Sequence, residues 1–229
     1  TISAYLRGLR AIYNAAINED TFRTEKNPFK IYKIPKSKRV KKKALSKECI
    51  SNFRKVDYKF ESSIWHTKNY MMVMFLARGM NFIDLAKLRL KNIYSGYLFY
   101  GRSKTGDPLS VKITPDLQRI LDYYLNDKKP SDFVFPIGND GSPEMFTKYS
   151  TDRRRVNKHL KTIAKDAGID GKLSTYYFRH SWATIAKYLG ISSEIISDAL
   201  GHKNLSTTEI YLKSFVNDTL DEANEMVTA

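Results

Sequence analysis

Cysteine is nearly absent from this chain of 229 residues, in which Cys49 is the single one. One cysteine cannot form an intrachain disulfide, so a disulfide-stapled fold is excluded. No apolar run approaches the ~20 residues that a membrane-spanning helix needs, and no signal-peptide pattern is visible. No glycine-rich phosphate loop and no internal repeat are found either. We therefore expect a cytoplasmic protein that does not enter a membrane.

Acidic residues are also scarce, because 24 Asp and Glu stand against 39 Lys and Arg, which gives a formal net charge of +15. So large an excess of one sign repels itself and indicates a polyanionic partner, for which nucleic acid is the first candidate. The alternative is a basic surface with no such partner. The hydrophobic fraction of 42% and the aromatic fraction of 13% are typical of a folded chain.

The first part of the chain predicts one helix and a basic connection. Residues 2–18 place apolar side chains on one helical stripe, and this helix needs a partner to cover that stripe. Because the chain opens inside the helical pattern, we expect it to be a fragment. Residues 26–43 contain two helix-breaking prolines and a run of lysines. This segment is either a solvated linker or a strap along a phosphate backbone, with Lys38, Arg39, Lys41, Lys42 and Lys43 as its candidate DNA contacts.

The remaining pattern predicts a mainly α fold with a small antiparallel β-hairpin or sheet (α+β). Strands over 97–100 and 109–113 flank a turn that places Lys104 at or near the tip of a hairpin. Helices are expected over 46–56, 60–77, 82–88, 115–126, 146–167, 174–189, 192–199 and 205–212, followed by an acidic helical tail over 214–228. The helix over 146–167 exposes either a solvated basic face or phosphate contacts, with Arg153, Arg154 and Lys158 as candidates.

Residues 176–211 carry the side chains with the clearest chemistry. Arg179 precedes His180, His202 follows in a Leu-Gly-His turn, and Tyr211 comes nine residues after His202. An arginine can hold two phosphate oxygens, a histidine can move a proton, and a tyrosine hydroxyl can attack phosphorus. Two histidines without a cysteine argue against zinc at this place. The stretch therefore predicts a site that handles a phosphodiester.

Three ordered blocks of the sequence resemble the tyrosine recombinases of the phage-integrase type, which include integrases of phages and conjugative transposons. The blocks are Arg78-Gly79-Met80 with Asp84 and Leu85, then Ser103-Lys104-Thr105-Gly106, then Tyr176 to Tyr211 with Leu200-Gly201-His202 and Thr207-Thr208. The resemblance implies the catalytic-domain fold of this family over residues 44–229, including a C-terminal tail helix. It also implies that residues 1–25 are the last helix of a truncated core-binding domain and that 26–43 is the linker.

The resemblance assigns roles in a site-specific recombinase of duplex DNA. Tyr211 would attack the scissile phosphate, giving a 3′-phosphotyrosyl intermediate and a free 5′-hydroxyl. Arg179 would clamp the phosphate, and His202 would bind a non-bridging oxygen or assist proton movement. Lys104, on a mobile hairpin, would protonate the leaving 5′-oxygen. Neither a metal nor ATP is required, and no cofactor is expected.

Two positions depart from the family pattern. Asn81 stands where the first block usually has arginine, and Arg78, three residues earlier on the same helical face, could replace it; the alternative is an ion pair with Asp84 or a helix cap. Tyr176 stands where histidine is more common, and a tyrosine with a pKa near 10 is a poor proton shuttle. His180 should point away from Arg179 and is interpreted as structural.

The acidic tail suggests how copies of the chain assemble. Its apolar residues Phe215, Val216, Leu220, Met226 and Val227 could dock on a neighbouring protomer. We therefore expect a homo-tetramer on DNA, with a monomer possible in solution; the alternative is a tail folded back on its own domain. Two other functions stay open: a DNA-binding module of the same fold with impaired catalysis, and a DNA-relaxing enzyme of the type IB topoisomerase kind.

Overall fold

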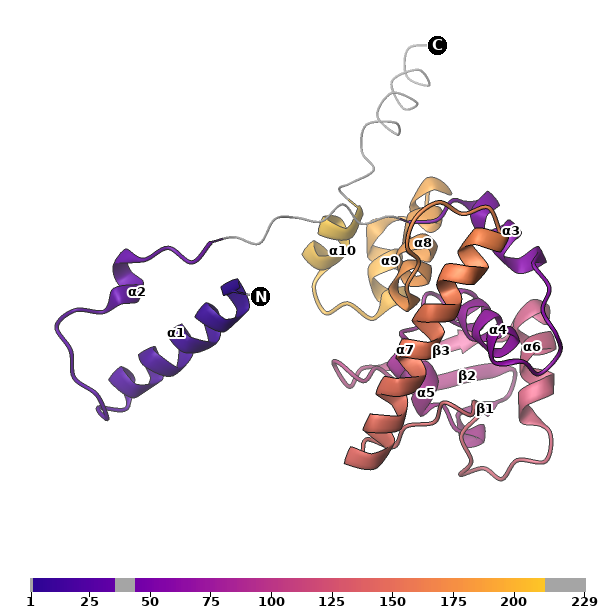
Figure 1. Cartoon of the computed structure of the whole chain (residues 1–229), viewed down its shortest axis with the longest axis horizontal. Coiled ribbons are helices and arrows are strands. Elements are labelled where there is room, and N and C mark those ends of the chain that lie inside the picture. The colour runs from indigo at the N-terminus through magenta and orange to yellow at the C-terminus, as the bar shows by residue number, and fades with distance from the viewer. Residues whose placement is uncertain (1, 36–43, 213–229) are drawn as a thin grey trace, which may run out of the picture. The chain divides into compact units, whose positions relative to one another are not determined.

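The computed structural model of this chain describes residues 2–35 and 44–212, and for residues 210 and 211 it describes the backbone alone. It divides into two compact units, residues 1–41 and 42–229, each of which is described by itself (Figure 1). The predicted strap residues Lys38, Arg39 and 41–43, and the predicted tail helix over 214–228, lie outside the described residues.

The first unit contains the predicted amphipathic helix, α1 (Ile2–Asn18), which has no buried residue. Tyr13 on this helix packs edge-on against Phe22 and Phe29, with ring centroids 5.5 and 5.7 Å away. A short helix, α2 (Pro28–Ile31), follows, and the side chain of Asn27 accepts a hydrogen bond from the backbone of Phe29. Pro28 therefore starts a helical turn, because a proline is tolerated where no backbone N–H is needed.

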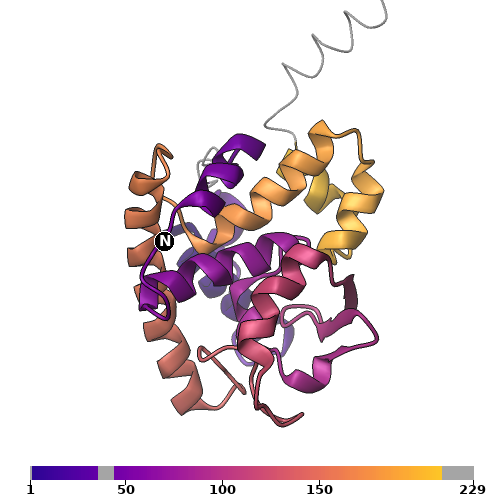
Figure 2. The ribbon, with the colours of Figure 1, turned by 90° about the vertical axis from the view of Figure 1, so that its right-hand side faces the viewer.

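The second unit is built around α4 (Ser63–Leu76), whose residues 70–74 are all buried. Helix α4 contacts α3 (Lys47–Lys55), α6 (Pro115–Leu125), α7 (Pro143–Asp166) and α8 (Thr175–Tyr188). Figure 2 shows α4 running through the middle of this unit with α7 along one side. Ser46 and Ser62 cap α3 and α4 through their side chains, as the sequence predicts for Ser46.

A three-stranded antiparallel sheet lies at one edge of this unit. Strand β2 (Tyr97–Gly101) pairs with β3 (Pro108–Lys112) and with the two-residue β1 (Ile93–Tyr94). The β2–β3 pair confirms the predicted hairpin, and Lys104 lies exposed in its turn. Helix α5 (Phe82–Lys87) and the short 3₁₀ helix η1 (Leu90–Asn92) connect α4 to this sheet.

The predicted start of the long basic helix was three residues late. Helix α7 begins at Pro143 because proline occupies its first turn and the Ser142 side chain caps the backbone of Met145. After it, α8 is followed by α9 (Ser193–Leu200) and α10 (Leu205–Leu212), close to their predicted bounds. The described part of the chain is thus mainly helical with one small antiparallel sheet, which confirms the predicted fold class.

Candidate functional site

Arg179 is the centre of the candidate site. It lies on α8 with only 2% of its surface exposed. Its Nη1 donates to the carbonyl of Gly79 at 2.9 Å, and its Nη2 donates to the carbonyl of Leu200 at 2.6 Å. The same Nη2 lies 3.3 Å from Nε2 of His202. One guanidinium therefore joins the turn after α4, the end of α9 and the histidine of the Leu-Gly-His turn.

The turn between α4 and α5 has the backbone that this contact requires. Gly79 has a φ of +70°, and a Cβ at this position would lie 3.0 Å from Cα of Arg179. A glycine is needed here for conformation and for space. Arg78 has a φ of +56° and is exposed. The prediction that Arg78 shares a helical face with position 81 was wrong, because α4 ends at Leu76 and Asn81 is the N-cap of α5.

His202 is oriented by contacts on both of its ring nitrogens. Gly201 ends α9 in the left-handed conformation with a φ of +63°, which turns the chain toward α10. The ring Nδ1 of His202 lies 2.7 Å from the hydroxyl of Thr208 on α10, and Thr208 is fully buried. With Nδ1 engaged by Thr208, Nε2 is the nitrogen that faces Arg179. Thr208 was named from the sequence as part of the third block but was assigned no role, because nothing in a single sequence shows that its hydroxyl meets His202.

Tyr211 follows Thr208 by three residues in α10. The backbone of Tyr211 is helical, while its side chain lies outside the described residues. The structure thus brings the helix that carries the predicted nucleophile next to the Arg179–His202 pair, through Thr208. The position of the Tyr211 hydroxyl itself stays a prediction.

A buried carboxylate holds the hairpin turn that carries Lys104. Asp84, with 2% of its surface exposed, accepts a hydrogen bond from the backbone N–H of Ser103 at 2.8 Å. Its other oxygen lies 3.3 Å from the side-chain nitrogen of Asn81. An ion pair between Arg78 and Asp84 was an alternative role predicted for Arg78 from the sequence. The described contacts include no such pair. The base of the Lys104 turn is therefore fixed to α5.

Three arginines act electrostatically on one buried hydroxyl in this region. Burial raises the pKa of Tyr100 to about 12, and the charge of Asp84 adds to this rise, while the charges of Arg179, Arg102 and Arg78 oppose it. The charges of these three arginines are therefore felt at Tyr100, and two of the arginines, Arg102 and Arg179, are themselves buried.

Two further residues of the third block lie on α8: Tyr176 is at the protein surface, and His180 is buried. Tyr176 is 49% exposed, and its ring meets that of His180 edge-on, with centroids 4.5 Å apart. His180 is 6% exposed. The burial of His180 against the Tyr176 ring agrees with its interpretation as structural.

The predicted basic helix residues lie on the solvent-facing side of α7. Arg153, Arg154 and Lys158 are all exposed, and the Arg153 guanidinium lies 5.8 Å from the ring centre of Tyr149. Arg155 differs from them, because it pairs with the buried Asp152 at 2.5 Å. A role for the first three in DNA contact stays a prediction.

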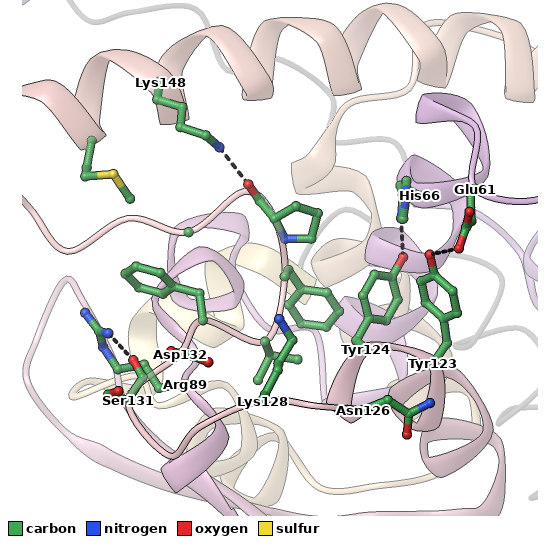
Figure 3. Close-up of a pocket in the computed structure, with 16 residues that line it drawn as sticks. Glu61, His66, Arg89, Tyr123, Tyr124, Asn126, Lys128, Ser131, Asp132 and Lys148 are labelled. Atoms are coloured by element: carbon green, nitrogen blue, oxygen red, sulfur yellow. Dashed lines mark hydrogen bonds between the residues drawn. The ribbon is translucent and has the colours of Figure 1, made fainter.

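A large cavity of about 980 Å³ lies elsewhere in the second unit, between the start of α4, the end of α6 and the start of α7 (Figure 3). Its polar groups bond to each other: His66 Nδ1 lies 2.8 Å from the Tyr124 hydroxyl, and the Tyr123 hydroxyl donates to Glu61 at 2.7 Å. Lys148 donates to the carbonyl of Pro136. None of the predicted catalytic residues lines this cavity.

Two general features of the described ranges, 2–35 and 44–212, bear on function. No three His, Cys, Asp or Glu side chains there gather as a metal site. No helix in these ranges is long and apolar enough to cross a membrane.

The comparisons with known proteins agree with this geometry. The model of the phage integrase family matches residues 38–218. Tyrosine recombinase XerA of Saccharolobus solfataricus is 28% identical over 192 residues, which cover 82% of this chain and 58% of that protein. A tyrosine recombinase of Thermosipho africanus is 27% identical over 232 residues, which cover 99% of this chain and 76% of that protein.

Two solved structures share the fold. A lambda integrase dimer bound to a COC′ core site superposes with a TM-score of 0.65 at 18% identity, over 91% of this chain and 71% of that one. The Tn1549 transposon integrase in complex with a circular-intermediate DNA gives a TM-score of 0.66 at 17% identity, over 96% of this chain and 77% of that one. The family model covers most of the sequence and all three blocks of the site. The chain belongs to the phage integrase family.

Proposed function

We propose that this chain is the catalytic part of a site-specific DNA recombinase, which cleaves and rejoins duplex DNA through a 3′-phosphotyrosyl intermediate. The observation that carries the proposal is the buried Arg179 guanidinium, 3.3 Å from His202 and bonded to the turns of two separate sequence blocks. The family relationship and the net charge of +15 support DNA as the substrate.

The chemistry follows from the side chains. The Tyr211 oxygen forms a bond to phosphorus, the bond to the 5′-oxygen breaks, and that oxygen takes a proton from the Lys104 ammonium. The phenolic proton passes to His202 or to water. Arg179 neutralises the non-bridging oxygens, and because alignment and charge dominate phosphoryl transfer, a preset guanidinium is the main requirement.

Tyr176 and Arg78 are proposed in secondary roles. Tyr176 is 49% exposed and Arg78 is exposed, so each can reach a bound backbone from outside the buried pair. Tyr176 would donate a hydrogen bond to a phosphate oxygen, and Arg78 would supply charge near Asn81. The exposed Arg153, Arg154 and Lys158, with the strap residues 38–43, would bind phosphates along the duplex.

We also propose that the active assembly is a homo-tetramer on DNA, joined by the C-terminal tail. Support comes from solved structures of the same fold, in which lambda integrase forms a dimer on a core site and a tetramer on a Holliday junction. Removing residues 214–229 should weaken assembly on DNA, measured by gel shift or light scattering, while a single copy still binds. Unchanged assembly would contradict this role of the tail.

The experiment for the function uses a nicked suicide duplex made from the DNA that flanks the parent gene, after its cleavage position is mapped. The wild-type chain should form a covalent adduct that Tyr211→Phe abolishes. Binding without any adduct would favour the catalytically impaired module, for which Asn81 and Tyr176 are the support. Plasmid relaxation independent of a site would favour the topoisomerase kind.

A further inference from the structure

Arg102 is a buried arginine that the catalytic roles above leave unused. It follows β2 directly, 7% of its surface is exposed, and its Nη1 donates to the carbonyl of Gly201. Its Nε has no hydrogen-bond partner in the described part of the chain. A buried, incompletely bonded guanidinium is costly to keep. Its retention therefore calls for a function beyond stability.

The backbone of Arg102 closes the turn that carries Lys104. Its N–H donates to the carbonyl of Asp107 at 2.9 Å, and its own carbonyl accepts from the N–H groups of Thr105 and Gly106 at 3.2 and 2.7 Å. Lys104 lies inside this closed turn. Whatever holds Arg102 in place therefore also sets where the Lys104 backbone lies.

The side chain of Arg102 reaches the residue directly before His202. A Cβ on Gly201 would lie 3.3 Å from Cδ of Arg102 and 3.1 Å from Cδ1 of Leu109, so the hairpin and the end of α9 are in close contact. A second contact joins the same two turns: the ammonium of Lys203, next to His202, lies 3.5 Å from a carboxylate oxygen of Asp107 in the hairpin. The contact between Arg102 and Gly201 is buried, whereas the pair of Lys203 and Asp107 is exposed. The buried contact should therefore contribute more to holding the two turns together.

Arg102 and Arg179 also bind neighbouring carbonyls. Arg179 donates to Leu200 and Arg102 donates to Gly201, and both carbonyls lie at the C-terminal end of α9, where the helix dipole favours cations. The two guanidinium groups therefore share one support. The end of α9 therefore holds the Lys104 turn, the His202 turn and Arg179 at fixed positions relative to each other.

We propose that Arg102 is a positioning residue, which fastens the Lys104 turn to the His202 turn so that Lys104 reaches the leaving 5′-oxygen. This inference rests on the proposed function for its catalytic consequence. It replaces the expected mobile hairpin with one that is anchored on both sides, at Asp84 and at Gly201. Arg102 itself need not touch the DNA.

The anchoring is tested first without DNA, by hydrogen exchange on Arg102→Met and on Arg54→Gln. Methionine keeps the length and apolar contact of the side chain but removes its donors. Arg54 is the matched control, because it makes a surface ion pair with Asp116 that joins α3 to α6 and involves neither the Lys104 turn nor the His202 turn. The hydrogen-bonded N–H groups of Ser103, Thr105 and Gly106 should exchange at least about tenfold faster in Arg102→Met only, at unchanged thermal stability. Unchanged exchange would overturn the proposal.

The catalytic consequence is tested with two versions of the suicide duplex, one with the natural 5′-oxygen and one with sulfur at that bridging position. A thiolate leaves without a proton, because thiols are far more acidic than alcohols. Arg102→Met should slow cleavage of the oxygen substrate by about 10²-fold, the size expected for lost general-acid catalysis. The sulfur substrate should restore cleavage to within about threefold of wild type, as it should for Lys104→Ala.

The outcomes separate this proposal from the function on which it rests. A defect of Arg102→Met that sulfur does not rescue would mean that Arg102 acts on the phosphate or on His202, and would overturn the positioning role. The wild-type adduct on the oxygen substrate reports the proposed function independently. If that adduct fails to form while hydrogen exchange behaves as expected, the function is wrong and the anchoring still holds.

Discussion

Within residues 44–212 the second unit shows two hydrophobic clusters of very unequal size, and the candidate site lies where they meet. The larger cluster contains residues from helices α3 through α7, from the sheet and from the start of α8. Phe53 and Phe178 belong to it, and their ring centroids are 4.8 Å apart. The smaller one contains five buried residues, Ala183, Ala186, Ile196, Leu200 and Leu212. Helix α8 contributes to both, with Phe178 in one and Ala183 in the other.

This difference divides the catalytic residues into two groups. The turn at Gly79, the carboxylate of Asp84 and the Lys104 hairpin are supported by the larger cluster. His202 and the helix of Tyr211 are supported by the smaller one. Arg179 bonds to carbonyls on both sides. Because local stability follows the number of buried apolar contacts, the part that carries the nucleophile should open more easily than the part that carries the lysine.

The largest effect should come from removing the group that bridges the two clusters. Arg179→Lys keeps the charge but loses the planar fork that reaches two carbonyls and two phosphate oxygens. We expect a loss of cleavage of at least about 10²–10³-fold, the size seen for one lost transition-state donor. Single-turnover cleavage of the suicide duplex measures it, with Arg155→Lys, which keeps the charge beside Asp152 on α7, as the control. Cleavage within tenfold of wild type would mean that Arg179 does not bind the phosphate.

Truncation within each cluster should show that they differ in stability. Ile196→Ala removes a buried side chain of the smaller cluster and Leu121→Ala one of the larger, each at a cost of about 2–5 kcal/mol. In hydrogen exchange, Ile196→Ala should reduce protection in α9 and α10 and leave α4 nearly unchanged, whereas Leu121→Ala should reduce it throughout the unit. Equal loss in α4 for both variants would show that the clusters unfold together.

Substitution of glycine tests how closely the two sides approach at the turn after α4. Gly79→Ala faces both a positive φ and the backbone of Arg179, whereas Gly96→Ala has a φ of +75° and nothing within 4 Å. Gly96→Ala should cost about 1 kcal/mol from conformation alone, and Gly79→Ala about 1–3 kcal/mol more. Denaturant unfolding measures both. Equal costs would show that the contact at Gly79 relaxes freely.

The smallest effect concerns the pH dependence of stability that two histidines, His66 and His159, contribute beside the larger cluster. Burial lowers the pKa of His66 and of His159, so their folded-state pKa values lie below the unfolded value near 6.5. Their contribution to stability is therefore complete above about pH 6.5 and is lost as pH falls through the folded-state values. The melting temperature should fall by a few degrees, roughly 1–4 °C, between pH 7.5 and 5.5. The double variant His66→Gln, His159→Gln should flatten this dependence; an unchanged slope would contradict it.

The sequence predicted elements whose signals are local. The Ser46 cap and the turn residues of the hairpin lie within a few residues of what they determine. The two-residue β1 was missed because it is too short to show alternation. The start of α7 was placed late because Pro143 was interpreted as part of a loop.

Contacts across the chain could not be predicted in the same way. Arg102 and Gly201 are 99 residues apart, and Arg179 and Gly79 are 100 apart. Nothing in the residue types at these positions encodes such a pairing without the fold. Arg78 shows the converse error, since helical spacing was applied to a residue that lies beyond the end of its helix.

The most direct measurement of the central claim is mass spectrometry of the covalent adduct. The suicide duplex is trapped with the wild-type protein, the DNA is digested to a short remnant, and the linked peptide is sequenced. A nucleotide joined through its 3′-phosphate to Tyr211 is the result that we predict. An adduct on another residue, or linkage through a 5′-phosphate, would contradict the mechanism and the roles of Arg179 and Lys104 together.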